Sequence, residues 1–336
     1  MNILIRADAS VTIGSGHVMR CLTIATTFKK LGHEVSFWME ELPGHLITFV
    51  MEAGFTVTKQ MQNVDILIVD HYQLGIEWER QMRPFTRKII VIDDLADRTH
   101  DCDLLLDQNV VANYEHRYDG LVPEHCVKLL GPGYLMMRQE FVEERKLAKV
   151  RTGQVNRLLV FMGGSDPTGE TLKALDAIQV YKEQLRSNHD YSFFEHVDVV
   201  VGGSNPDKDV IKQRCHELQL HYYCQINYLA TLMRKADFAI GAGGSAMWER
   251  CYVGLPSSST VVAANQMDTT NKAVELGAVL SLGWHEQVTS ETYKQLLMNL
   301  PLRTAKLVSM SKQGLTITNG QSGANAWLQE MVGLLP

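Results

Sequence analysis

The sequence predicts an α/β protein made of two doubly wound domains that face each other across a cleft. Short β-rich segments alternate with amphipathic or polar segments through the first 130 residues, and the same alternation restarts near residue 157. A polar, charged stretch separates the two series, and a length of 336 residues fits two domains better than one. Two successive series of this kind predict two Rossmann-like domains.

Each series divides into predicted strands and helices. In the first, the β-rich segments predict strands at 2–7, 34–39, 65–70, 88–92, 103–106 and 127–130. The segment 17–31 has the apolar spacing of a helix packed on a sheet, with Lys29 and Lys30 in its last turn and Gly32 as its C-terminal cap. In the second series, strands are predicted at 157–161, 197–201, 221–224, 237–240 and 258–262, and helices at 169–181, 207–218, 227–235 and 245–253.

These elements predict the domain organisation. An N-terminal domain is expected over 1–135 and a C-terminal domain over 156–336, whose last helix is expected to pack back on the first domain. Residues 136–155 include eight charged side chains between 138 and 151 and are expected to connect the two domains.

The composition excludes several classes of protein. A hydrophobic content of 45% with 21% charged residues is that of a globular protein, not of a disordered or fibrous one. The net charge is −6 and neither half is basic, which argues against a nucleic-acid partner. Six scattered cysteines suit a reducing compartment, and no apolar run is long enough to span a membrane. A cytoplasmic protein without membrane association is therefore expected, with a monomer as the default.

The first candidate site is a glycine-rich turn that follows the first strand. Ligands of open parallel sheets bind where a strand's carboxyl end leads into a helix. Here Gly14, Ser15 and Gly16 allow close approach to the backbone, and the helix that begins near His17 offers unpaired N–H groups to an anion. The positive field at a helix start disfavours the imidazolium, so His17 is expected to be neutral and able to act as a general base. A helix-capping or structural histidine is the alternative.

Two further glycine-rich turns follow strands of the second series. Each of them could hold a phosphate through backbone N–H groups. The first contains Gly163, Gly164, Ser165 and Asp166, and the second contains Gly243, Gly244 and Ser245. Glu249 lies one helical turn after Ser245 and could bind a ribose diol. Either turn alone could be a capped tight turn, but together they favour a nucleotide.

Polar residues at other strand ends complete the candidate site. Asn265 and Gln266 follow the strand at 258–262 and could bind the hydroxyl or acetamido groups of a sugar. Asp70 and Tyr72 end the strand at 65–70, again at the ligand edge of the sheet. Each could equally be a turn or cap residue.

Six aspartates crowd the region from Asp93 to Asp107, and Asp101-Cys102-Asp103 has the D-x-D spacing of a metal-nucleotide motif. That motif belongs to a different glycosyltransferase architecture. A solvated acidic loop is therefore the expectation here, and no metal site is predicted.

Five motifs in this order resemble the UDP-sugar hydrolases of pseudaminic acid biosynthesis. They are G-S-G-H-V-M-R at 14–20, V-D-H-Y at 69–72, F-M-G-G-S-D at 161–166, G-A-G-G-S-A-M-W-E at 241–249 and A-N-Q at 264–266. The resemblance runs from the first strand to about residue 330. Members of that family hydrolyse UDP-2,4-diacetamido-2,4,6-trideoxy-β-L-altropyranose to UDP and the free sugar.

The resemblance implies a GT-B type fold, with UDP bound by the second domain. It implies that His17 activates water, that Tyr72 borders the sugar, and that Glu249, Asn265 and the turn at 241–245 bind the nucleotide sugar. Attack of water at the anomeric carbon with inversion then follows, without a cofactor or a metal. The surface polysaccharide or flagellin that finally receives the product is left open.

Three alternatives remain at this point. A GT-B glycosyltransferase with a UDP-sugar donor and a soluble acceptor would use the same residues of the second domain. A nucleotide-sugar binding protein without turnover would bind the substrate but release no product. An NAD-dependent oxidoreductase would need a third glycine where Met19 stands.

Overall fold

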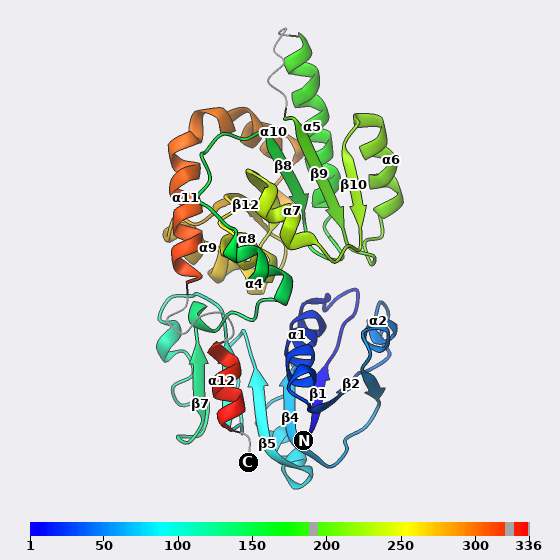
Figure 1. The fold of residues 1–336 in the computed structure, drawn as a ribbon, viewed down its shortest axis with the longest axis vertical. Coiled ribbons are helices and arrows are strands. Elements are labelled where there is room, and N and C mark those ends of the chain that lie inside the picture. The colour runs from blue at the N-terminus through cyan, green and yellow to red at the C-terminus, as the bar shows by residue number, and fades with distance from the viewer. Residues whose placement is uncertain (188–193, 320–325, 335–336) are drawn as a thin grey trace. The chain divides into compact units, whose positions relative to one another are not determined.

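The computed structural model describes residues 1–187, 194–319 and 326–334, which form two compact units (Figure 1). Unit 1 comprises Met1–Arg138 and Gly320–Pro336, and unit 2 comprises Gln139–Asn319. Within the described ranges, no helix is long and apolar enough to cross a membrane.

Unit 1 is built on a parallel sheet, which in the described part of the chain has seven strands in the order β3-β2-β1-β4-β5-β6-β7. Its strands are β1 (Asn2–Ala7), β2 (Glu34–Trp38), β3 (Thr56–Thr58), β4 (Val64–Asp70), β5 (Thr86–Ile92), β6 (Leu104–Asp107) and β7 (Val127–Leu130). Its helices are α1 (Gly16–Lys30), α2 (Ile47–Glu52), α3 (Ile76–Met82) and α12 (Ala326–Gly333).

The central strands of unit 1 are buried on both faces, which is why their sequences are almost continuously apolar. Along β1, Ile3 and Ile5 face a core that includes the apolar side of α1. Leu4 faces the opposite core, against which Trp78 of α3 packs. Helices therefore cover both faces of the sheet, as a doubly wound fold requires.

The last helix, α12, belongs to unit 1 although the preceding helix belongs to unit 2. Trp327 and Met331 are fully buried in the same core as α1 and β6, and Figure 1 shows this helix lying along the sheet. Burial of an indole is among the largest hydrophobic contributions that one side chain can make. The C-terminal segment is thus part of the unit 1 core.

Unit 2 contains a second parallel sheet, with six strands among the described residues in the order β10-β9-β8-β11-β12-β13. Its strands are β8 (Arg157–Phe161), β9 (His196–Val201), β10 (His221–Cys224), β11 (Phe238–Ala242), β12 (Ser257–Val261) and β13 (Leu280–Trp284). Its helices are α4 (Gln139–Lys146), α5 (Glu170–Ser187), α6 (Lys208–Leu218), α7 (Leu229–Lys235), α8 (Ser245–Tyr252), α9 (Met267–Glu275), α10 (Ser290–Asn299) and α11 (Thr304–Ile317).

The charged stretch expected to connect the domains forms helix α4, which is packed within unit 2. Glu144 accepts a hydrogen bond from the Thr231 hydroxyl at 2.7 Å and pairs with Arg234, both on α7. Arg145 donates to the carbonyl oxygens of Tyr252 and Leu315. The charges that mark this stretch in the sequence therefore attach α4 to its own unit.

Every strand predicted from the sequence is present, with ends within two residues of the expected positions. The sequence missed β3 and β13, which are edge strands of the two sheets. β3 has three residues and none of them is buried, and β13 contains Gly283 and pairs with β12 through a register shift. Edge strands carry a weaker apolar signal because one side lies outside the sheet.

The strand order of each sheet reverses once, and the reversal marks the expected position of a ligand. In unit 1 the chain runs outward from β1 and returns to β4 beside it, and in unit 2 it runs outward from β8 and returns to β11. Open α/β sheets bind ligands at the carboxyl ends of the strands at such a switch point. The segments after β1, β4, β8 and β11 contain all three glycine-rich turns.

Candidate functional site

The turn after β1 brings His17 to the beginning of α1. The Gly14 N–H donates to the Ser10 carbonyl at 2.8 Å, and Gly14 has a φ of +82°, a conformation that favours glycine. The Ser15 side chain makes no cap hydrogen bond to α1. Nothing lies within 4 Å of where a Cβ on Gly14 or Gly16 would stand, so the backbone of this turn is open to approach.

The imidazole of His17 is held by a buried carboxylate on the neighbouring strand. His17 Nδ1 lies 2.5 Å from Oδ1 of Asp70, the last residue of β4, and His17 is only 5% exposed. A carboxylate can only accept here, so Nδ1 carries a proton, and when the ring is neutral Nε2 is left as an acceptor. No described residue bonds to Nε2. This is the arrangement of a general base whose tautomer is fixed by an acid behind it.

Arg20 shares the same carboxylate from one turn further along α1. Its Nε and Nη2 atoms lie 2.5 and 2.6 Å from Oδ2 and Oδ1 of Asp70, and its Nη1 donates to both carboxylate oxygens of Asp94 at 2.8 and 2.9 Å. Burial by itself would raise the pKa of Asp70, but Arg20 and His17 hold that pKa well below its usual range. Asp70 is therefore a carboxylate at neutral pH.

These contacts correct the sequence-based expectation for Asp70. Substrate contact was expected, but Asp70 is fully buried, and its oxygens face His17, Arg20 and, at 3.6 Å, the thiol of Cys21. Asp70 therefore lies behind the His17 ring, within the core of unit 1.

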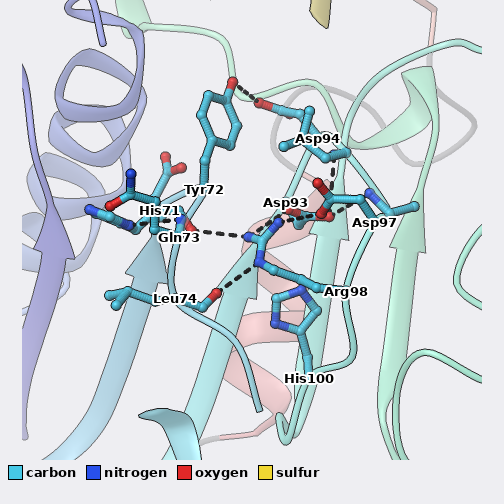
Figure 2. A network of polar contacts seen from close by, with 12 residues as sticks. His71, Tyr72, Gln73, Leu74, Asp93, Asp94, Asp97, Arg98 and His100 are labelled. Atoms are coloured by element: carbon cyan, nitrogen blue, oxygen red, sulfur yellow. Dashed lines mark hydrogen bonds and ion pairs between the residues drawn. The ribbon is translucent and has the colours of Figure 1, made fainter. Parts of the chain in front are cut away.

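Tyr72 lies next to the His17 ring and belongs to the same polar network. The ring centroids are 4.4 Å apart in an edge-to-face arrangement. The Tyr72 hydroxyl donates to Asp94 Oδ2 at 3.2 Å, a contact drawn in Figure 2. The Asn109 side chain donates to Asp94 Oδ1 at 2.8 Å. Asp94 therefore links Arg20, Tyr72 and Asn109 beside the candidate base.

Arg98 links the loop that contains Tyr72 to the loop that contains Asp94. Its guanidinium donates to the Leu74 carbonyl at 2.8 Å and the His71 carbonyl at 3.0 Å, and it pairs with the buried Asp93 carboxylate at 2.8 Å. Figure 2 shows Arg98 between these residues. Burial alone would raise the pKa of Asp93, but Arg98 and backbone N–H groups lower it. The loops after β4 and β5 are thereby held as one structure.

The acidic region from Asp93 to Asp107 is not the solvated loop that the sequence predicted. Asp93, Asp103 and Asp107 are buried. Asp101 and Asp103, the two acids of the D-x-D spacing, both pair with Arg83, and Asp103 also pairs with Lys88. In the part of the chain that the structure describes, no three histidine, cysteine or acidic side chains are placed to hold a metal ion.

In unit 2, the turn after β8 is backed by the loop after β9. Gly163 has a φ of +95°. Gly164 lies so close to Gly202 that a Cβ on Gly202 would lie 2.1 Å from the Gly164 carbonyl oxygen. Ser204 donates to that oxygen at 3.0 Å. Nothing lies within 4 Å of a Cβ on Gly163, and Ser165 is half-buried, so the turn keeps an accessible side.

Asp166 requires a second correction. It was expected to contact substrate, but it is 4% exposed and its carboxylate accepts from the N–H groups of Glu170 and Thr171 at 3.0 and 2.8 Å. It therefore caps the beginning of α5.

The turn after β11 leads directly into α8. Gly243 is buried, Gly244 has a φ of +75°, and Ser245 is the exposed first residue of the helix. Glu249 is half-buried one helical turn later. The turn thus presents the beginning of a helix, where backbone N–H groups and the helix dipole favour an anion.

Asn265 and Gln266 lie in a single turn of 3-10 helix (Ala264–Gln266) that follows β12. The Gln266 side-chain oxygen accepts from the Val262 N–H at 3.1 Å, and the side chain packs against Gly243 and Gly244. Asn265 is exposed. The structure thus brings Gln266 beside the turn that contains Gly243, Gly244 and Ser245.

Sequence reasoning missed Arg20, Asp94 and Arg98. Arg20 could have been found, because it stands three residues after His17 and so lies on the same helix face. Asp94 follows β5 at the same sheet edge as Asp70, which the parallel topology implies. Arg98 had no local signal, since its partners come from two loops.

The fold of the chain is that of GT-B proteins. It matches the solved structures of Acinetobacter baumannii MurG (TM-score 0.60, 13% identity) and of the spinosyn rhamnosyltransferase SpnG (TM-score 0.62, 13% identity). These matches cover 99% of this chain and 98% and 100% of those chains. These structures define the class of fold, two Rossmann-like units of the GT-B type.

The sequence relatives identify the family. The chain is 31% identical over 290 residues to the UDP-2,4-diacetamido-2,4,6-trideoxy-β-L-altropyranose hydrolase of Campylobacter jejuni, which covers 82% of this chain and 97% of that protein. The chain belongs to this hydrolase family. No family model matches it.

Two other relatives are longer proteins. The uncharacterized protein MJ1062 of Methanocaldococcus jannaschii is 26% identical over 76% of this chain. The Helicobacter pylori protein named as both pseudaminic acid cytidylyltransferase and the same hydrolase is 24% identical over 90% of it. The chain spans about half the length of these two relatives, 54% and 51%.

Proposed function

We propose that the protein hydrolyses UDP-2,4-diacetamido-2,4,6-trideoxy-β-L-altropyranose to UDP and the free sugar. The observation that carries this proposal is the short contact between His17 Nδ1 and the buried Asp70 carboxylate, which leaves Nε2 as a proton acceptor. The name of the Campylobacter jejuni relative supplies the substrate.

The proposed reaction is a displacement at the anomeric carbon. His17 Nε2 takes a proton from a water molecule, whose oxygen forms the new bond to the anomeric carbon from the face opposite UDP. The bond between that carbon and the β-phosphate oxygen breaks, and its electron pair leaves with UDP. The sugar is therefore released with inverted anomeric configuration.

Within this proposal, Asp70 and Arg20 act on the base and not on the substrate. Asp70 holds the imidazole in the productive tautomer and stabilises the imidazolium that forms. Arg20 offsets the charge of Asp70 while its contact with Asp94 keeps it in place. Tyr72, whose ring contacts His17, is proposed to border the sugar.

Unit 2 is proposed to hold the nucleotide. Backbone N–H groups of the turns at Gly163–Ser165 and Gly243–Ser245 would bind the diphosphate, and the beginning of α8 would stabilise the negative charge that develops on UDP. Glu249 would bind the ribose, and Asn265 and Gln266 would bind the polar groups of the sugar.

The test uses the proposed substrate in ¹⁸O-water, followed by NMR and mass spectrometry. Label in the sugar and none in UDP is expected, because water attacks carbon, and the first anomer observed should be the inverted one. His17→Ala should lose most of the turnover while binding UDP as the wild type does. Label in the phosphate, or full turnover by His17→Ala, would refute the mechanism.

A glycosyltransferase is the second candidate, favoured by the fold shared with the spinosyn rhamnosyltransferase SpnG. UDP release only after an acceptor sugar is added would establish it. UDP-sugar binding without any product would indicate a binding protein instead.

A further inference from the structure

A buried guanidinium lies directly behind the turn after β11. Arg250, on α8, is completely buried, and its Nη2 donates to the Ala242 carbonyl at 2.7 Å and to the Ser259 hydroxyl at 2.9 Å. Its Nε and Nη1 groups have no hydrogen-bond partner among the described residues. Its two bonded acceptors are both uncharged, so this cation is held without an ion pair from the described part of the chain.

Gly241, the next-to-last residue of β11, makes room for this guanidinium. A Cβ on Gly241 would lie 2.3 Å from Arg250 Nη1 and 3.0 Å from the Phe161 carbonyl oxygen. Gly241 does not have a positive φ, so its backbone conformation does not require glycine. Space for Arg250 is therefore the physical reason for glycine here.

Burial of the Arg250 guanidinium without an ion pair lowers the stability of the protein when no ligand is bound. Burial lowers the pKa of Arg250 to about 10, so the group is still charged at neutral pH. A buried cation is normally paired, because desolvation without a nearby anion is strongly unfavourable. Glu249, the preceding residue, partly offsets this lowering of the pKa through its charge.

Arg151 provides an informative contrast within the same unit. Burial also lowers its pKa to about 10, and it too donates to carbonyl oxygens, those of Met233, Arg234 and Ala236. These carbonyls lie at the C-terminal end of α7, where a cation complements the helix dipole. Arg151 thus has a structural explanation in the fold. Arg250 belongs to the last turn of α8, but its guanidinium reaches back to the carbonyl of Ala242, the last residue of β11.

We propose that Arg250 is a positioning residue that supplies positive charge, through the backbone of Ala242, to a nucleoside diphosphate bound at the turn Gly241–Ser245. The guanidinium and the beginning of α8 then act on the same anion with the same sign. Arg250 does not touch the ligand. The inference rests on the proposed function, because the diphosphate is that of UDP.

The test compares UDP with uridine, which lacks the diphosphate, by titration calorimetry. Arg250→Met should weaken UDP binding about tenfold or more and leave uridine binding within about twofold of wild type. Arg250→Lys, which keeps the charge, should bind UDP within about threefold of wild type. Arg151→Met is the matched control, a buried arginine removed elsewhere in unit 2, and should leave the ratio of UDP to uridine affinity unchanged.

The outcomes separate this inference from the proposed function. Equal losses for UDP and uridine in Arg250→Met, or no loss, would overturn the role of Arg250 while leaving UDP binding intact. A wild-type protein that binds neither ligand would overturn both. If Arg250→Met does not fold, the Arg250 Nε–H signal of ¹⁵N-arginine-labelled wild type, assigned with Arg250→Lys, should shift with UDP and not with uridine. An Arg250 signal that does not shift when UDP is added would also overturn the inference.

Discussion

Replacing Asp70 by asparagine tests the candidate base most directly. The substitution keeps the size of the side chain but turns one of two acceptor oxygens into an NH₂ donor. In the wild type those oxygens face donors on His17 and Arg20 at 2.5 to 2.6 Å. An amide has one acceptor for the two side chains, so at least one of these contacts must place a donor against a donor.

The magnitude follows from which contact is lost. If the NH₂ replaces Oδ1 it faces both His17 Nδ1 and Arg20 Nη2, and if it replaces Oδ2 it faces Arg20 Nε, which also cannot give up its proton. In the first orientation Nδ1 must accept and the proton moves to Nε2, which can no longer take one from water. In both orientations the carboxylate charge that stabilises the imidazolium is lost. The equivalent change in a Ser-His-Asp triad lowers kcat by roughly 10⁴, so a loss of about 10³ to 10⁴ is expected here, or about 4 to 5.5 kcal/mol.

The assay measures kcat for release of UDP together with the affinity for UDP. In Asp70→Asn, kcat should fall while the dissociation constant of UDP stays unchanged, because Asp70 lies in unit 1. Adding the change to His17→Ala should cause no further loss, since residues that act as a unit are not additive. Asp103→Asn is the control, because it removes another buried carboxylate of unit 1, one that pairs with Arg83. It should lower stability but leave kcat within about threefold of wild type.

Retention of more than a tenth of wild-type kcat by Asp70→Asn would refute this reasoning. A further hundredfold loss in the double variant would also refute it, because Asp70 would then act independently of His17. Thermal unfolding accompanies each measurement, since a buried pair that loses one partner can cost about 3 kcal/mol.

Three further predictions concern other parts of the molecule. Trp327→Ala should lower the free energy of unfolding by about 3 to 5 kcal/mol in urea titrations, because Trp327 is fully buried in the unit 1 core; a change below 1 kcal/mol would contradict that placement. Burial, followed by the charge of Asp94, raises the pKa of Asp107 to about 6. The folded chain therefore binds more protons than the unfolded chain between about pH 4 and 6, and this group's contribution to stability falls by up to about 3 kcal/mol as pH rises through that window. Asp107→Asn should lack this fall in urea titrations from pH 4 to 7, and identical pH dependence in both proteins would count against it. Gly243→Ala places a Cβ 3.0 Å from the Gln266 side-chain oxygen, so UDP affinity should drop about tenfold in calorimetry, whereas unchanged affinity would remove this turn from the site.

The candidate site shows which features a sequence can predict locally. The sequence predicts His17 and the three glycine-rich turns as candidate site residues because their signals are local: a strand, a glycine turn and the beginning of a helix lie close together along the chain. Asp70 was placed at the correct sheet edge but given the wrong partner, because burial of a side chain depends on neighbours from other strands. Asp166 was misassigned in the same way, since a capping carboxylate and a ligand-binding one have the same sequence context.

By itself, the sequence determined the two series of alternating strands and helices, and with them the strand ends at which a ligand would bind. Hydrophobic periodicity and glycine turns are short-range properties, so they can be read along the chain. Only the tertiary structure decided that β4 lies beside β1 and so places Asp70 behind His17, and that Arg250 lies beneath the turn that begins at Gly241. These pairings depend on strand order and on the burial of charge, which arise when distant segments pack together.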